Sequence, residues 1–367
     1  MRIAGRVSVL LTSVLAAACD AADREMPAAA LLALAEPQES SGSGDTTLVD
    51  MEAFGNAFEI SRSLLLQETD QAVTVLPMVS PGVPGEFLLA EPREGQVNVY
   101  DTAGRLRRVV GRRGGGPGEF HSPVSARRTV NGGIVVVDPM LSRLTFFPEE
   151  GSGEPEVVAS PLPLVLGAQD LGGGRYLLSG QVMSEQPPRL LHIWDRETDE
   201  VERSFLPIGV PRESRPYAAS YTSVDAVLEG DTIWSVWALS DTLYKLERDG
   251  GVIERFPLSL PRPMGRLPGA EAGVITDPRA LQAAAERLTQ VNGVFILGDG
   301  ALAVQAMQAR GFEAVWDLLI LDRRGTMRWR AARMPRLFAV VGDSFYFDDP
   351  ASLLPNHWVV ARWRGEG

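Results

Sequence analysis

The chain has 367 residues, of which 45% are hydrophobic and 22% charged, and its formal net charge at pH 7 is −12. This balance is that of a folded globular protein, and the length allows one large β domain or two ordinary domains. The negative charge would repel a phosphate backbone, so we expect no nucleic-acid partner.

The first 18 residues have the pattern of an export signal. Arg2 and Arg6 supply positive charge, and the apolar run VSVLLTSVLAAA that follows has 12 residues, too few to span a bilayer. Cys19, the single cysteine, comes directly after three alanines and resembles the lipid-modified cysteine of bacterial lipoproteins. Ala16 stands where leucine is most common in that motif. The alternative is ordinary cleavage after Ala18, which would release a free secreted protein.

Residues 19–45 are expected to form a flexible tether, because the segment ends in the Ser/Gly-rich run ESSGSGD. Its apolar patch AAALLALA is either a short helix or a second cleavage region. An unpaired cysteine is easier to explain as an anchor than as half of a disulfide. We therefore expect a monomeric lipoprotein of the cell envelope, attached to the membrane only through its N-terminal lipid. Asp20 also resembles, weakly, an inner-membrane retention signal.

Two short units recur beyond residue 45. A turn followed by a strand begins six times, at Gly85, Gly132, Gly173, Gly230, Gly298 and Gly342. A strand–turn–strand unit recurs between these, and within it Tyr100, Phe147 and Trp194 hold the same place at intervals of 47 residues. A period of 40–50 residues with several strands per repeat is typical of β-propeller blades.

We predict an all-β fold, a six-bladed β-propeller of four-stranded antiparallel blades, over residues 46–367. The predicted blades are residues 72–110, 123–159, 164–209, 221–260, 288–335 and 336–367. The last blade is one strand short, and we expect residues 57–68 to supply that strand and close the ring. The long connection at 261–290 contains DPRALQAAAERL, which predicts a short amphipathic helix with Asp277 as its N-cap.

The stretch GRRGGGPGEF at residues 111–120 could be a phosphate loop or a joint between blades. The Walker A pattern fails because Pro117 and Gly118 stand where lysine and serine or threonine are needed. No helix follows whose N-terminus could bind phosphate. As a joint the stretch is well suited, since glycines permit sharp turns and Phe120 can anchor the returning strand between blades.

The run GRRGGGPGEFHSP, followed by GGIVVVDPMLSRLTFF, resembles bacterial six-bladed β-propellers related to NHL repeats. Asp138 ends the strand of this motif, and Arg143 lies five residues later, before an aromatic pair. Only one blade carries the complete pattern, over about 35 residues. The resemblance implies the fold and the number of blades, and it implies no activity.

The sequence contains no recognisable catalytic motif. His121, His192 and His357 are far apart and lack the spacing of a metal site, and no G-x-S-x-G nucleophile elbow is present. We assign no catalytic residue and no resident cofactor. His121, beside the glycine stretch, is the one histidine that we place near the mouth of the propeller.

Candidate binding residues lie in or beside the predicted first strands of the blades, where propellers build their central sites. With His121 they are Arg127, Arg128, Asp170, Asp225 and Asn292. The polar character of these positions is also explained by a water-filled channel. We expect a binding or protein-interaction module that recognises an envelope protein or a small ligand. The alternative is a metal-dependent hydrolase, lactonase or lyase, in which acidic and amide oxygens converge on Ca²⁺.

Overall fold

The computed structural model describes residues 48–365 apart from 71, 76, 82–84, 150–152, 182–187, 211–213, 215–223, 266–282, 312 and 353. The predicted export signal, Cys19 and the tether therefore lie outside the described residues. Within the described part, no helix is long and apolar enough to cross a membrane.

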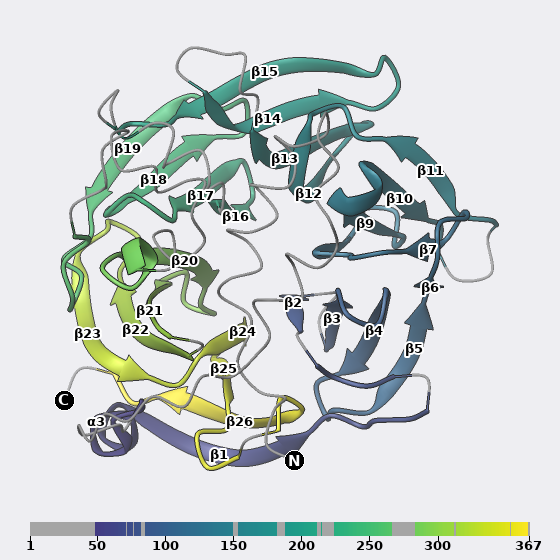
Figure 1. The fold of residues 1–367 in the computed structure, drawn as a ribbon. Coiled ribbons are helices and arrows are strands. Elements are labelled where there is room, and N and C mark those ends of the chain that lie inside the picture. Colours follow the sequence, from purple (N-terminus) through teal and green to yellow (C-terminus); the bar gives the residue numbers. More distant parts are fainter. Residues whose placement is uncertain are drawn as a thin grey trace.

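The strands form a closed ring of six antiparallel four-stranded sheets around a central axis (Figure 1). Blade 1 consists, in order, of β2 (Met78–Pro81), β3 (Glu86–Glu91), β4 (Gln96–Asp101) and β5 (Leu106–Val110). Blade 2 consists of β8 (Ser125–Arg128), β9 (Ile134–Asp138), β10 (Arg143–Phe147) and β11 (Glu156–Ala159). Blade 3 consists of β12 (Leu164–Gly172), β13 (Arg175–Gln181), β14 (Arg189–Asp195) and β15 (Glu200–Pro207).

Blades 4 to 6 complete the ring and confirm the predicted six-bladed propeller. Blade 4 consists of β16 (Val224–Glu229), β17 (Thr232–Trp237), β18 (Thr242–Glu247) and β19 (Val252–Pro257). Blade 5 consists of β20 (Thr289–Ile296), β21 (Leu302–Arg310), β22 (Glu313–Leu321) and β23 (Met327–Met334). Blade 6 consists of β24 (Leu337–Val341), β25 (Ser344–Asp348), β26 (His357–Trp363) and β1 (Phe58–Leu65). In each blade the first strand of this order lies nearest the axis and the last lies at the outside.

The N-terminal strand β1 closes the ring, as predicted, by pairing antiparallel with β26 from Phe58 opposite Trp363 to Leu65 opposite His357 (Figure 1). Before it, α3 (Met51–Ala57) starts at Asp50, whose carboxylate accepts the Ala53 N–H at 2.9 Å and serves as the N-cap. The Asp50 N–H donates to the carbonyl of residue 333 in blade 5. Helix and strand thus join the start of the propeller to its last two blades.

The hydrophobic core of the described residues is divided into six clusters, one between each pair of neighbouring blades. In the cluster between blades 5 and 6, Phe54 and Phe58 pack against Phe345 and Phe347 with ring centroids 5.1–5.2 Å apart. Each blade is covered on both faces by its neighbours, which explains why its strands contain apolar residues on both sides.

The three aromatic residues that mark the sequence repeat occupy equivalent strands. Tyr100, Phe147 and Trp194 lie on β4, β10 and β14, the third strands of blades 1 to 3. Tyr100 and Trp194 are fully buried. The interval of 47 residues therefore reports the repeat of one blade along the chain.

The glycine stretch forms the joint between blades 1 and 2. β6 (Arg112–Arg113) and β7 (Glu119–Phe120) pair in parallel, and Phe120 is fully buried in the cluster between the two blades. Gly111 has a φ of +75°, and a Cβ there would lie 2.3 Å from the Phe120 ring. This glycine is required by both backbone conformation and space.

Asp138 and Arg143, the two residues of the NHL-like pattern, hold this joint. The buried Asp138 carboxylate accepts the backbone N–H of His121 at 2.7 Å and of Ser122 at 3.2 Å, and it also caps the short 3₁₀ helix η2 (Pro139–Leu141). The Arg143 guanidinium donates to the carbonyls of Gly115 and Gly116, both at 2.9 Å. The pattern thus has a structural role between blades.

The long connection between blades 4 and 5 is anchored at its beginning by Arg262. Its guanidinium donates two hydrogen bonds, at 2.7 and 2.9 Å, to the carboxylate of the fully buried Asp317 on β22. Most of the predicted helix, including Asp277, lies outside the described residues. Its described end is helical at 283–285, and Ala284, Ala285 and Leu288 are buried between blades 3 and 4.

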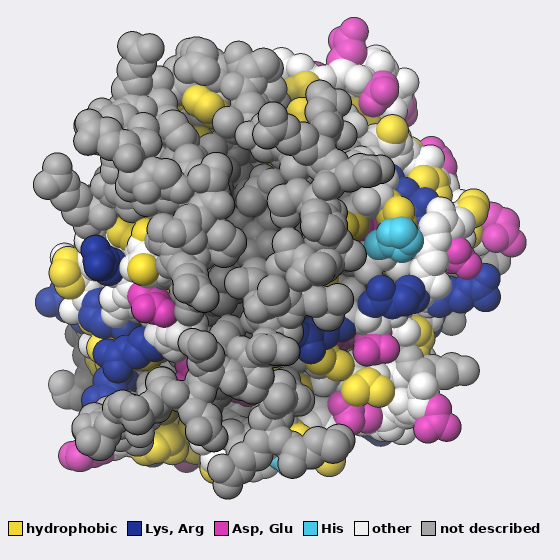
Figure 2. Space-filling view, viewed as in Figure 1, with side chains coloured by type: hydrophobic (Ala, Val, Ile, Leu, Met, Phe, Trp, Pro, Cys, Tyr) yellow, Lys and Arg dark blue, Asp and Glu magenta, His cyan; other side chains and the backbone are white. Residues whose placement is uncertain are grey.

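The described side chains of the face in Figure 2 carry mixed charge. Arginine and acidic side chains lie next to each other over the outer strands, near β5–β7 on one side and near β19 and β23 on the other. Arg112 forms an ion pair with Glu119 at 2.7 Å, and Arg323 forms one with Glu229 at 2.9 Å. On this face the described charges of opposite sign therefore lie side by side.

We expect Gly111→Ala to lower the free energy of unfolding by about 1–3 kcal/mol, because it strains the backbone and overpacks the Phe120 ring. Gly115→Ala is the matched control in the same joint, since no atom lies within 4 Å of a Cβ there, and it should change stability by less than about 0.5 kcal/mol. Urea unfolding of both variants measures the difference. Equal effects would contradict the packing role assigned to Gly111.

Candidate functional site

A central cavity of about 410 Å³ lies on the axis of the propeller. The innermost strands of all six blades line it, and residues from β13, β14, β21 and β22 contribute to its wall. Each blade presents at least one polar side chain from the innermost strand or the residue before it, namely Ser80, Arg127, Gln169, Asp225, Asn292 and Arg336. This size and mixture of polar and apolar groups are typical of small-molecule sites.

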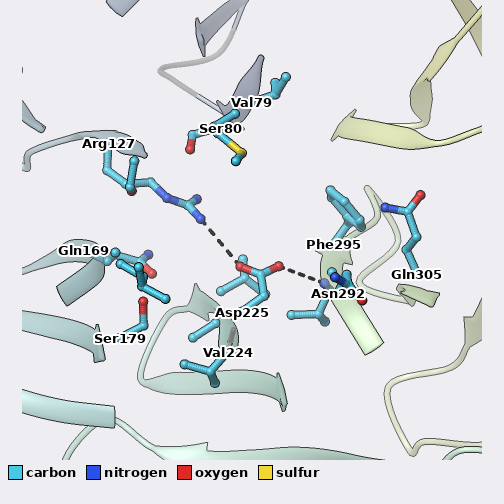
Figure 3. Close-up of a pocket in the computed structure, with 18 of the residues that line it drawn as sticks. Val79, Ser80, Arg127, Gln169, Ser179, Val224, Asp225, Asn292, Phe295 and Gln305 are labelled. Atoms are coloured by element: carbon cyan, nitrogen blue, oxygen red, sulfur yellow. Dashed lines mark hydrogen bonds and ion pairs between the residues drawn. The ribbon is translucent and has the colours of Figure 1, made fainter. Parts of the chain in front are cut away.

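Arg127 and Asp225 form a charge pair inside the cavity (Figure 3). Arg127 lies on β8 in blade 2 and Asp225 lies on β16 in blade 4. The pair therefore connects two blades that are separated by blade 3 in the ring. The guanidinium Nη2 and the carboxylate Oδ1 are 3.8 Å apart, which is too long for a hydrogen bond. The side chains keep 23% and 29% of their surface accessible, so both remain open to the cavity.

The other oxygen of Asp225 is fixed by blade 5. Oδ2 accepts the backbone N–H of Val294 on β20 at 2.9 Å. Burial raises the pKa of the Asp225 carboxyl above its ordinary value, although Arg127 and the N–H groups of Val294 and Ala226 act in the opposite direction. The ionised carboxylate is therefore held at a free-energy cost, and its Oδ1 remains available for a further hydrogen bond.

Two side-chain amides in the cavity wall are incompletely satisfied. Gln169 lies on β12 and Asn292 on β20, on either side of Asp225 in Figure 3. Gln169 Oε1 and Asn292 Oδ1 are buried and have no hydrogen-bond partner among the described residues. An unsatisfied buried acceptor costs about 1–3 kcal/mol. Rotation of either amide toward a donor on a bound ligand would recover part of that cost.

A second guanidinium, that of Arg336, lies at the cavity wall beside blade 6. It stacks over the rings of Trp316, 5.3 Å from the centroid, and Phe338, 4.9 Å from the centroid. Burial lowers the pKa of Arg336, and the nearby carboxylate of Asp348 acts in the opposite direction. Arg336 is thus largely committed to the aromatic rings and to Asp348.

The remaining wall is mainly apolar, with Ser125, Ser179 and Gln305 as further polar residues. It includes Leu177, Leu191, Val224, Phe295 and Met307. Val224 precedes Asp225 on β16, and Figure 3 places Phe295 on the far side of Asp225 from Arg127. The charge pair therefore lies next to hydrophobic surface, where an electrostatic contact is weakened less by water than on the outer surface.

Three of the six predicted site residues meet in this cavity, namely Arg127, Asp225 and Asn292. The other three do not line it. Arg128 points to blade 1, where its guanidinium donates twice to the Glu86 carboxylate, both times at 2.8 Å. The Asp170 carboxylate accepts the backbone N–H of Val130 at 3.0 Å and of Gly172 at 2.7 Å.

The three histidines lie apart in the structure. His121 is exposed after the short strand β7, and its backbone N–H is bound by Asp138. His192 is fully buried on β14, with its Nδ1 2.8 Å from the Ser204 hydroxyl. His357 begins β26. None of them is among the described residues that line the central cavity.

Sequence reasoning missed Ser80, Gln169, Phe295 and Arg336. Gln169 was detectable in principle, because it is the direct neighbour of the predicted Asp170 and successive strand residues point to opposite faces. Arg127 and Arg128 are likewise direct neighbours on one strand and point to opposite faces. Ser80 carries no local signal beyond its place in a first strand, and Arg336 precedes β24 by one residue.

Among the described residues, no group of three or more His, Cys, Asp and Glu side chains could hold a metal ion. Asp170 and Asp225 have separate partners and do not converge on one point. The charged group nearest to Asp225 is the Arg127 guanidinium, which itself competes with a cation for the carboxylate.

We expect Asp225→Asn to raise the free energy of unfolding of the ligand-free protein at pH 7. A raised pKa means that the folded state binds the proton more tightly than the unfolded chain, so ionisation of Asp225 reduces stability. This free-energy cost is absent at pH values below the pKa of Asp225 in the unfolded chain. It grows as the pH rises through the pKa of Asp225 in the folded protein. The stability gain from the substitution should therefore shrink when urea unfolding is repeated at progressively lower pH.

Asp249→Asn is the control, and we expect it to change the free energy of unfolding in the opposite direction. Hydrogen bonds from the Gly251 N–H lower the pKa of the Asp249 carboxyl, with a further contribution from Arg203. Its ionised form therefore stabilises the fold at pH 7, and its substitution should reduce stability there. If Asp225→Asn also reduces stability at pH 7, the proposed cost of the buried carboxylate is wrong.

Comparison with known proteins supports the propeller fold. No protein-family model and no curated protein matches the sequence. A candidate exported protein from Bacteroides fragilis is similar in structure, with a TM-score of 0.61 and 12% identity over 85% of this chain and 96% of that one. A member of the DUF4221 family from Bacteroides vulgatus has a TM-score of 0.63 and 10% identity over 84% of this chain and 97% of that one. At these identities the likeness shows a shared propeller fold.

Proposed function

We propose that this protein is an extracytoplasmic binding propeller that holds a small polar ligand in its central cavity. The observation that carries the proposal is the Arg127–Asp225 charge pair, which is open to the cavity and too widely spaced to hydrogen bond. A charge pair kept inside a protein costs desolvation free energy. The hydrogen-bond donors and acceptors that the pair does not use are suited to bind a ligand.

The wall around the pair supports this function. Asn292 and Gln169 add amide groups with unsatisfied oxygens, and Val224 and Phe295 add apolar contact. A few polar groups that fix orientation within a mainly apolar surface are the usual composition of a ligand pocket. The cavity volume of about 410 Å³ suits a small molecule and is too small for a folded domain.

The proposed location depends on the N-terminal sequence. Arg2, Arg6, the apolar run and Cys19 have the arrangement of a lipoprotein signal. The structural neighbour from Bacteroides fragilis is itself described as a candidate exported protein. A propeller attached by a tether of about 25 residues could present its cavity to ligands outside the cytoplasm while staying at the membrane. The relation to NHL-repeat propellers is part of the same proposal.

Thermal unfolding of the purified protein with a panel of sugars, lactones, amino acids and Ca²⁺ tests the ligand-binding function. A ligand at a hundredfold excess over its dissociation constant should stabilise the folded state by about 2.7 kcal/mol and raise the unfolding midpoint. A shift that appears only with Ca²⁺ and is reversed by a chelator would instead favour the metal-dependent enzyme.

Ser179→Phe is designed to obstruct the cavity, since Ser179 lines it on β13. It should abolish the shift produced by any cavity ligand. Arg112→Gln is the matched control, because Arg112 is exposed on the outer joint, and it should leave the shift unchanged. A ligand shift that survives Ser179→Phe places binding elsewhere and contradicts the proposed site.

Replacement of Cys19 tests the membrane anchor. We expect the native protein to sediment with membranes and to incorporate labelled palmitate, and Cys19→Ser to lose the label, because the sulfur carries the lipid. Fractionation of cells that express either form measures both properties. If the native protein is already unlabelled and found in the soluble fraction, cleavage after Ala18 is the correct alternative.

A further inference from the structure

The charge pair in the central cavity has more hydrogen-bonding capacity than the protein uses. A guanidinium carries five N–H donors, and among the described residues Arg127 has only the 3.8 Å contact with Asp225. The Asp225 carboxylate can accept about four hydrogen bonds, and a hydrogen bond from Val294 occupies Oδ2. The site thus presents a positive and a negative group side by side, each with free capacity.

A ligand that satisfies both groups must carry opposite charges in adjacent positions. A carboxylate alone would pair with Arg127 but would meet the like charge of Asp225. An amine alone would pair with Asp225 but would meet Arg127. An uncharged sugar would offer hydrogen bonds but no opposite charge to either group. An α-amino acid carries its ammonium and carboxylate on one carbon, which matches the close spacing of Arg127 and Asp225.

We propose that the central cavity binds a free α-amino acid, with its carboxylate on Arg127 and its ammonium on Asp225. The inference rests on the ligand-binding function proposed above. Charge-assisted hydrogen bonds of this kind are shorter and roughly twice as strong as those between neutral groups. Asn292 lies next to Asp225 on the neighbouring blade, and its unpartnered amide oxygen is suited to accept a second N–H from the ammonium group.

The wall of the cavity indicates the type of side chain. Val224 and Phe295 lie beside Asp225, and Leu177, Leu191 and Met307 extend the apolar surface. The second guanidinium, Arg336, is engaged with Trp316, Phe338 and Asp348. An uncharged, apolar side chain such as that of leucine or methionine fits this environment. A dipeptide fits less well, because each added residue moves the two charges about 3.5 Å farther apart.

Isothermal titration of the full-length protein with matched ligands tests this assignment. L-Leucine should bind at least tenfold more tightly than 4-methylpentanoate, which lacks the ammonium group, isoamylamine, which lacks the carboxylate, and the dipeptide Leu-Leu. Arg127→Gln and Asp225→Asn should each weaken leucine binding at least tenfold, while Arg112→Gln should not change it.

Asp225→Asn provides a readout that a merely structural role would not produce. Removal of its negative charge should increase the affinity for 4-methylpentanoate above that of the native protein, while the affinity for leucine falls. Loss of both affinities together in a folded variant, or equal binding of leucine and 4-methylpentanoate to the native protein, would overturn the zwitterion assignment. So would a complete absence of amino-acid binding.

The failure of this inference can be told apart from that of the proposed function. If a sugar or lactone binds the native protein and Ser179→Phe abolishes that binding, the cavity is a ligand site and only the amino-acid assignment is wrong. If no small molecule binds, or if every bound compound still binds Ser179→Phe, the ligand-binding function of the cavity is wrong as well.

Discussion

The pairing of β1 with β26 is the interaction on which the propeller depends. Every blade has two apolar faces, and only a closed ring covers all twelve with neighbouring blades. The last blade has three strands from the C-terminal part of the chain and takes its outer strand from residues 58–65. Phe54 and Phe58 extend this closure into the core, where they pack against the aromatic residues of blade 6. With this closure, one hydrophobic cluster lies between every pair of neighbouring blades.

Closure also creates the site. The innermost strands surround the axis and their side chains do not fill it, so a cavity of about 410 Å³ remains at the centre. Arg127, Asp225 and Val294 come from blades 2, 4 and 5, and the ring alone brings them within reach of one another. The strands that hold them are supported from behind by the rest of each blade. The geometry of the charge pair is therefore a property of the whole ring.

The sequence predicts the architecture well because its signals are local or periodic. The interval between Tyr100, Phe147 and Trp194 reveals the blade, and the glycines of the joint identify the crossing between two blades. The site is less predictable, because it depends on which of two neighbouring strand residues faces the axis. On β12 the structure places Gln169 in the cavity, whereas the sequence favoured its neighbour Asp170, whose carboxylate accepts the backbone N–H groups of Val130 and Gly172.

The closing strand also fixes when the protein can fold. β1 is the first strand of the ring to be synthesised, and its partner β26 is the last. Until that final segment has been made, β1 lacks its partner and blades 1 and 6 lack part of the surface that covers them. This topology delays closure of the ring, and of the cavity that the ring encloses, until β26 has been synthesised.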